Sequence, residues 1–117
     1  MILISFLCCY NLVAIADVQQ SEAPDWRSTA QSIIGALDYV AIDYPEAVQG
    51  GEITNADEYA EQRDFLITVN DLLATLPAHD KQQTLLTQAQ DLAALVEQRA
   101  SSASVALASR KLVADLI

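Results

Sequence analysis

Apolar residues recur every three or four positions through most of this chain, and that spacing predicts amphipathic helices. The first pattern begins after Asp25, a candidate N-cap, and runs to about Tyr44. Pro45 should end this helix, because proline disfavours helical geometry in the residue before it. Its apolar positions are Trp26, Ala30, Ile33, Leu37, Val40 and Tyr44. We expect Trp26 to anchor one end of a helical core.

The second pattern opens at Asn55, with Glu58 three residues on, which is a variant of the capping box. It should end at Leu76-Pro77. Its buried stripe is Tyr59, Gln62, Leu66, Val69, Leu72 and Leu73, with Phe65 beside it.

Two further helices are predicted after Pro77. Asp80 is the candidate N-cap of the third, whose inner face holds Leu85, Ala89, Leu92, Val96 and Arg99. The segment Ala100–Ser104 predicts a kink or short turn. The fourth pattern then places Val105, Ala108, Leu112 and Leu116 on one face. Four such helices joined by short loops predict an all-α, antiparallel up-and-down four-helix bundle.

The chain begins with an apolar segment, residues 2–16, that is shorter than the roughly 20 residues a bilayer span needs. It ends in Ala14-Ile15-Ala16, a small-x-small cleavage site, although no Lys or Arg precedes it. We interpret 1–16 as a secretory signal peptide and 17–117 as one helical extracytoplasmic domain. Cleavage would remove both cysteines, Cys8 and Cys9. Because Ile117 lies uncapped within a helical pattern, we expect the domain to be truncated at its C-terminal end.

Charge narrows the possible partners. The net charge of −10 repels phosphate backbones and anionic lipid, so nucleic acid is excluded as a partner, and cations or basic proteins are favoured. No nucleophile, phosphate-binding or dinucleotide motif is present, and the lone His79 has no second histidine for a zinc site. We therefore expect neither an enzyme nor a binder of small-molecule substrates.

The acids concentrate between Asp38 and Asp64, where eight carboxylates and three tyrosines meet a single base, Arg63. Asp57, Glu61 and Asp64 share a helix face, where like charges are mutually unfavourable. Asp38 and Asp43 precede a helix C-terminus, where the dipole disfavours negative charge. Two interpretations follow from residue types alone: a solvated acidic surface, or oxygen ligands that converge on a hard cation.

A resemblance bears on this choice. The string LDYVAIDYPEAV at 37–48, followed by Gly51, Asn55, EYAEQ at 58–62 and Phe65, is similar to a recurring pattern. It resembles the N-terminal extracytoplasmic region of bacterial oxidase-dependent (Ftr-type) iron permeases, in the subgroup with a cytochrome c domain. The resemblance runs from about Ser28 onward and is sharpest between Leu37 and Phe65. The Cys-x-x-Cys-His haem attachment motif and the Arg-Glu-x-x-Glu permease motifs are absent from the sequence.

The resemblance implies a periplasmic helical domain that serves iron uptake, with the permease membrane domain and the cytochrome c domain as partners. Its acidic region would present carboxylates to iron or dock the transporter. The candidate iron ligands are Asp38, Asp43, Glu58 and Glu61, with Tyr39, Tyr44, Asp57 and Asp64 as secondary candidates. Tyr39, Tyr44 and Pro45 would fix the loop. The alternative is a metal-independent interaction module whose acidic face docks a basic partner.

Overall fold

The computed structural model describes residues 25–117, and the predicted signal peptide lies outside this part of the chain. Four helices follow one another with a short hairpin after the first. Their bounds are α2 Trp26–Ala47, β1 Val48–Gln49, β2 Glu52–Ile53, α3 Ala56–Thr75, α4 Gln82–Glu97 and α5 Ser102–Leu116. The prediction of an all-α four-helix bundle is confirmed. None of the helices between residues 25 and 117 combines the length and apolar character needed to cross a membrane.

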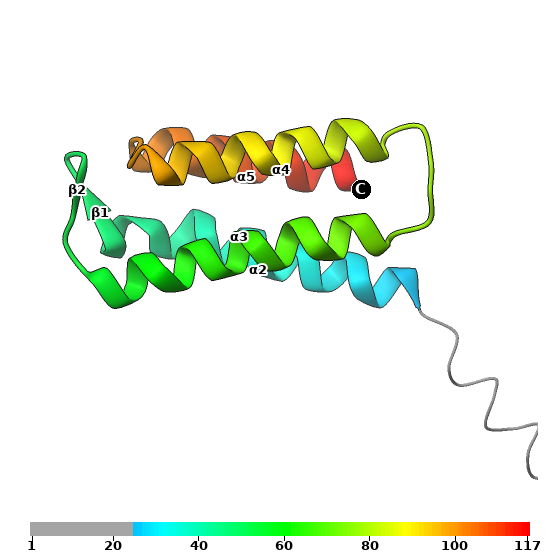
Figure 1. Cartoon of the computed structure of the whole chain (residues 1–117), viewed down its shortest axis with the longest axis horizontal. Coiled ribbons are helices and arrows are strands. Elements are labelled where there is room, and N and C mark those ends of the chain that lie inside the picture. The colour runs from blue at the N-terminus through cyan, green and yellow to red at the C-terminus, as the bar shows by residue number, and fades with distance from the viewer. Residues whose placement is uncertain (1–24) are drawn as a thin grey trace, which may run out of the picture.

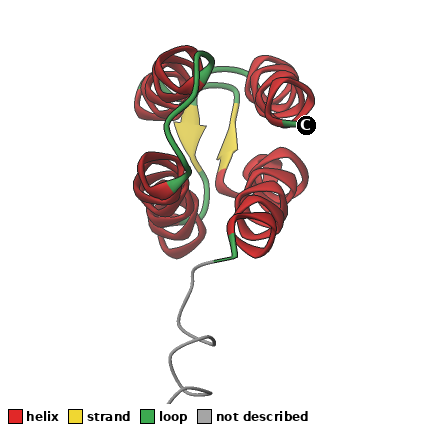
Figure 2. Ribbon diagram, turned by 90° about the vertical axis from the view of Figure 1, so that its right-hand side faces the viewer, coloured by secondary structure: helices red, strands yellow, loops and turns green. Residues whose placement is uncertain are grey.

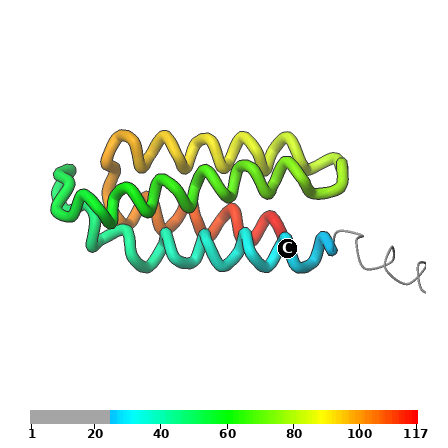
Figure 3. The backbone as a smooth tube through the Cα atoms, turned by 60° about the horizontal axis from the view of Figure 1, so that its bottom comes forward, coloured from blue at the N-terminus to red at the C-terminus, as the bar shows by residue number. Residues whose placement is uncertain are grey.

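The helices form two layers that face each other, α2 with α3 and α4 with α5 (Figures 1 and 2). Each helix runs antiparallel to the next, and α2 also packs against α5, which closes the bundle (Figure 3). The hairpin projects from one end, beyond the α4–α5 turn, while the α3–α4 loop lies at the opposite end.

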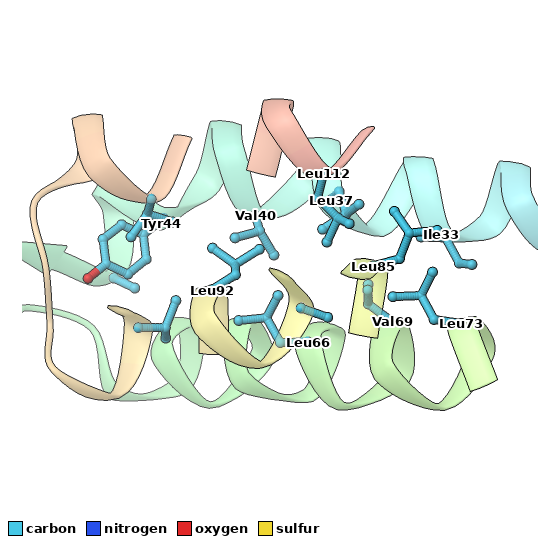
Figure 4. Packing of buried hydrophobic residues seen from close by; sticks show 14 of the residues in the cluster. Ile33, Leu37, Val40, Tyr44, Leu66, Val69, Leu73, Leu85, Leu92 and Leu112 are labelled. Carbon is cyan, nitrogen blue, oxygen red and sulfur yellow. The ribbon is translucent and has the colours of Figure 1, made fainter. Parts of the chain in front are cut away.

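The core follows the predicted stripes along the bundle axis (Figure 4). Ile33, Leu37 and Val40 of α2 are fully buried. They pack in one apolar cluster with side chains from the other three helices, which are Leu66, Val69, Leu73, Leu85, Ala89, Leu92, Val96, Val105 and Leu112. Burying a side chain of this size contributes about 1.5–3 kcal/mol, so this apolar stripe is the main stabilisation of the helices.

Local capping agrees with the sequence at the starts of α2 and α3. Asp25 Oδ1 accepts a hydrogen bond from the Arg27 amide (3.1 Å) at the predicted N-cap of α2. Asn55 Oδ1 accepts a hydrogen bond from the Glu58 amide (3.1 Å), as the capping-box spacing predicts. Ser101 Oγ accepts from the Ser104 amide (3.2 Å) at the start of α5. The predicted turn between the third and fourth helices therefore ends in a well-formed N-cap.

The prediction that Pro45 stops the first helix at Tyr44 is wrong. The helix continues to Ala47 with Pro45 inside its last turn. The Val48 amide still donates to the Tyr44 carbonyl, and Tyr44 itself is fully buried. The tertiary packing of Tyr44 overrides the local preference of a residue that precedes proline.

The hairpin was not predicted. Gly50 and Gly51 have φ angles of +60° and +81° and form a two-residue turn between paired strands. This is the left-handed backbone that a tight hairpin turn requires and that glycine adopts without strain.

Three further expectations are wrong. Trp26 is 49% exposed rather than a core anchor, and the Arg27 guanidinium lies 4.6 Å from its ring centroid. Lys81, not Asp80, occupies the N-cap position of α4, and it makes no side-chain capping bond. Arg99 lies exposed in the α4–α5 turn with φ of +56°, because α4 already ends at Glu97.

Candidate cation-facing surface of α2 and α3

Charge is divided unequally between the two layers of the bundle. Residues 25–75, which form α2, the hairpin and α3, hold ten carboxylates and two arginines. Residues 76–117, which include α4 and α5, hold four carboxylates and four bases. The excess negative charge of the described chain therefore lies in the α2–α3 layer.

The ion pairs increase this difference in charge between the layers, because none of them joins a base to a carboxylate of the α2–α3 layer in the described part of the chain. Among residues 25–117 the ion pairs are Arg63 with Glu97 (2.7 Å) and Lys111 with Asp115 (3.3 Å). Arg63 is the sole base of α3, and it turns toward α4 rather than toward the acids of its own layer. Hydrogen bonds from Gln88 and Lys111 lower the pKa of the Asp115 carboxyl. No carboxylate between Asp38 and Asp64 takes part in an ion pair in this part of the chain.

The four candidate iron ligands come from both helices of the acidic layer. Asp38 and Glu61 are exposed, and Asp43 and Glu58 are half-buried. Within residues 25–117, no group of three or more His, Cys, Asp or Glu side chains is close enough to hold a metal ion. The structure thus brings the four onto one layer but does not gather them into a formed metal centre, and their role as ligands stays a prediction.

A seam between α2 and α3 brings two of these acids into opposition. Tyr39 and Phe65 stack across the seam, with ring centroids 5.3 Å apart and planes inclined by 25°. Asp43 follows Tyr39 by four residues and Glu61 precedes Phe65 by four, so one turn along each antiparallel helix places them on the same seam. Asp57 and Asp64, the secondary acidic candidates, are exposed on α3.

Behind the seam lies a buried polar group. Gln62 is fully buried and its Nε2 donates to Glu58 Oε1 (2.8 Å). Its Oε1 has no hydrogen-bond partner among the described residues. This hydrogen bond holds the Glu58 side chain along the helix, so one of its two carboxylate oxygens already has a partner within the protein.

Two tyrosines of the α2–α3 layer turn inward. Tyr44 donates to the Ala100 carbonyl (2.7 Å) and Tyr59 to the Val96 carbonyl (2.8 Å). Val96 lies in the last turn of α4 and Ala100 in the α4–α5 turn, and the Val96 carbonyl also accepts from the Arg99 amide (2.9 Å). Burial raises the pKa of Tyr44, and the neighbouring Tyr59 raises it further, while Arg99 acts in the opposite sense. The two hydrogen bonds therefore hold the α4–α5 turn against α2 and α3.

Sequence reasoning did not predict these two hydrogen bonds. The helical spacing did place Tyr44, Tyr59 and Gln62 on the inner faces, which is a usable signal for burial. It carries no signal for the carbonyls they contact, because those are 37 and 56 residues away in the chain.

The fold and surface together define a small four-helix bundle with one acidic layer and one charge-balanced layer. Residues 19–117 match the family of the iron permease-associated 4-helix bundle domain. The chain belongs to this family, and it therefore has a role in an iron permease system. Neither a curated protein nor a solved structure matches it.

Proposed function

We propose that this chain is an extracytoplasmic accessory domain that turns its α2–α3 layer toward iron and supplies the ion to a permease. Membership of the permease-associated family supports the link to iron uptake. The apolar leader at residues 2–16 supports the location outside the cytoplasm. The permease membrane domain and, by resemblance, a cytochrome c domain would be its partners.

The observation that carries the proposal is the division of charge between the layers. A surface with ten carboxylates and two arginines attracts cations over a distance set by ionic strength, about 10 Å at 0.1 M salt. Attraction of this kind needs no closed coordination shell, and carboxylate oxygens are ligands that iron accepts. The acidic layer would raise the local concentration of iron and release it readily to a transporter.

Within this layer the Asp43–Glu61 seam is the proposed point of closest contact with the ion. Both side chains lie on facing positions of α2 and α3, and Glu58 lies one turn before Gln62 on the same helix. A cation between them would be attracted by both carboxylates. Asp38 would contribute to the negative electrostatic potential around the α2–α3 layer, which attracts the ion.

Thermal unfolding of the whole chain with and without Fe²⁺, under anaerobic conditions, tests the proposal. At about ten times Kd, a bound ion contributes about 1.4 kcal/mol, which in a domain of this size corresponds to a rise in Tm of roughly 5 °C or more. We expect Glu58→Gln with Glu61→Gln to abolish most of this rise.

The matched control removes the same charge from the other layer, by Asp80→Asn with Asp91→Asn. This variant should keep the full iron-dependent rise in Tm, because Asp80 and Asp91 belong to the charge-balanced half. Equal losses in both double variants would show that iron responds to net charge alone, and an unchanged Tm in the wild type would refute iron binding.

A further inference from the structure

The outer face of the α2–α3 layer is apolar at its centre. Tyr39 is 54% exposed and Ile42 is 69% exposed, and they lie three residues apart on α2. Phe65 of α3 joins them through its stacking contact with Tyr39. Isolated exposed apolar residues are common on proteins, but Tyr39 and Ile42 are neighbours at three-residue spacing on α2, and stacking extends the group to α3. We call these residues the Tyr39–Phe65 patch.

Carboxylates surround this patch. Asp38, Asp43 and Glu46 flank it on α2, and Glu61 and Asp64 flank it on α3. The nearest base along α3, Arg63, is held by Glu97 on the far side of that helix. An apolar centre surrounded by a polar rim is the arrangement of a protein–protein interface.

We propose that the Tyr39–Phe65 patch is a docking surface for a basic amphipathic segment of another protein. The apolar side chains of that segment would cover Ile42 and Tyr39, and its Lys or Arg residues would face the surrounding carboxylates. Charge complementarity selects this occupant, because opposite potentials favour association and like potentials oppose it. The docking does not rest on the proposed role in iron supply, because it needs no metal ion.

The same charges argue against the other occupants. An anionic membrane surface would be repelled by the acidic rim, as would a second copy of this chain that presented the same face. A free cation would interact with the carboxylates but would gain nothing from Ile42, whose side chain has no ligand atom. Substitution of the exposed Ile42 therefore distinguishes docking of a protein segment from attraction of a cation.

The test uses the whole chain in EDTA and a synthetic peptide of Lys, Leu and Ala, with its leucines at helical spacing. Ile42→Ser removes the most exposed apolar side chain of the patch, and Leu107→Ser on α5 is the matched control. Leu107 is 70% exposed on the charge-balanced layer. Because both changes replace an exposed aliphatic residue in a helix, their effects on folding should match, which circular dichroism can verify.

Covering a side chain of this size predicts that Ile42→Ser weakens peptide binding at least about tenfold, while Leu107→Ser changes Kd less than about twofold. A peptide whose leucines are replaced by alanine should bind both variants alike. Equal losses in the two variants would overturn the proposal, since the apolar contact would then not be confined to this patch; unchanged binding in both would overturn it as well, since binding would then follow charge alone. So would sedimentation that shows a wild-type dimer and a monomeric Ile42→Ser chain, because the occupant would then be a second copy.

Loss of iron-dependent stabilisation with retained peptide docking would refute the proposed function and leave this inference standing. Retained iron-dependent stabilisation with loss of peptide docking would refute this inference and leave the proposed function standing. The EDTA in the peptide experiment and the absence of peptide in the iron experiment keep the two readouts independent.

Discussion

At the scale of single residues, Tyr44 links the acidic layer to the opposite layer. Its hydroxyl donates to the Ala100 carbonyl from a fully buried position. Tyr44→Phe should lower the free energy of unfolding by about 1–3 kcal/mol, because the Ala100 carbonyl would lose its buried partner. Urea denaturation measures this, and Tyr39→Phe on the exposed part of the same helix should change it by less than about 0.5 kcal/mol. Similar losses in both variants would contradict the role given to the Tyr44 bond.

The raised pKa of Tyr44 makes this residue sensitive to alkaline pH. Above its ordinary value of 10.0 the unfolded chain loses the Tyr44 proton while the folded chain retains it, so the unfolded state is favoured. Stability from this group is thus complete below pH 10 and decreases as pH rises toward the folded pKa. The stability of Tyr44→Phe relative to wild type should therefore improve above pH 10, which urea denaturation across that range would reveal.

At the scale of elements, the α4–α5 turn carries backbone strain at Arg99. Its φ of +56° is a conformation that costs an L-residue roughly 1–2 kcal/mol and that glycine adopts freely. Arg99→Gly should raise the free energy of unfolding by about 0.5–1 kcal/mol after the entropy of the unfolded glycine is subtracted. Arg99→Ala is the control, because it removes the same charge but keeps the strain. A comparable gain from alanine would assign the effect to the arginine side chain instead.

The elements also show what the sequence could specify. Spacing alone located all four helices and most of the buried stripe, because Leu, Val and Ile at three- and four-residue intervals have one way to become buried together. The carboxyl end of α2 was predicted three residues short, since burial of Tyr44 outweighs the effect of Pro45. The hairpin was missed although Gly50-Gly51 is a strong turn signal, because two-residue strands leave almost no alternation to detect.

The positions of the candidate acids along the fold were predictable, but their side-chain geometry was not. Composition placed the acids at the α2–α3 junction, and the structure places them on the α2–α3 layer. Whether carboxylates converge depends on side-chain directions around each helix, which a list of acids does not contain. The hydrogen bond from Gln62 to Glu58 illustrates this, because a residue taken from the apolar stripe restrains a candidate ligand.

At the scale of the whole molecule, self-repulsion within the acidic layer should limit stability. The described α2–α3 half holds ten carboxylates, and those between Asp38 and Asp64 have no ion-pair partner among residues 25–117. Asp64→Lys should therefore raise the free energy of unfolding at low salt by roughly 0.5 kcal/mol, since it replaces repulsive pairs with attractive ones. Asp91→Lys, an equal charge change on α4, should produce little gain because that half is already balanced.

Salt distinguishes this electrostatic cause from a change in packing or helix propensity. At about 1 M ionic strength the screening length falls to roughly 3 Å, so the advantage of Asp64→Lys should disappear while a packing effect would persist. Urea denaturation of both variants at low and high salt measures the difference. A gain that survives high salt, or equals that of Asp91→Lys, would mean that repulsion is not concentrated in the acidic layer. Conversely, a gain confined to low salt would identify the acidic layer as a surface kept at a cost in stability, which is expected where negative charge serves to attract iron or a basic partner.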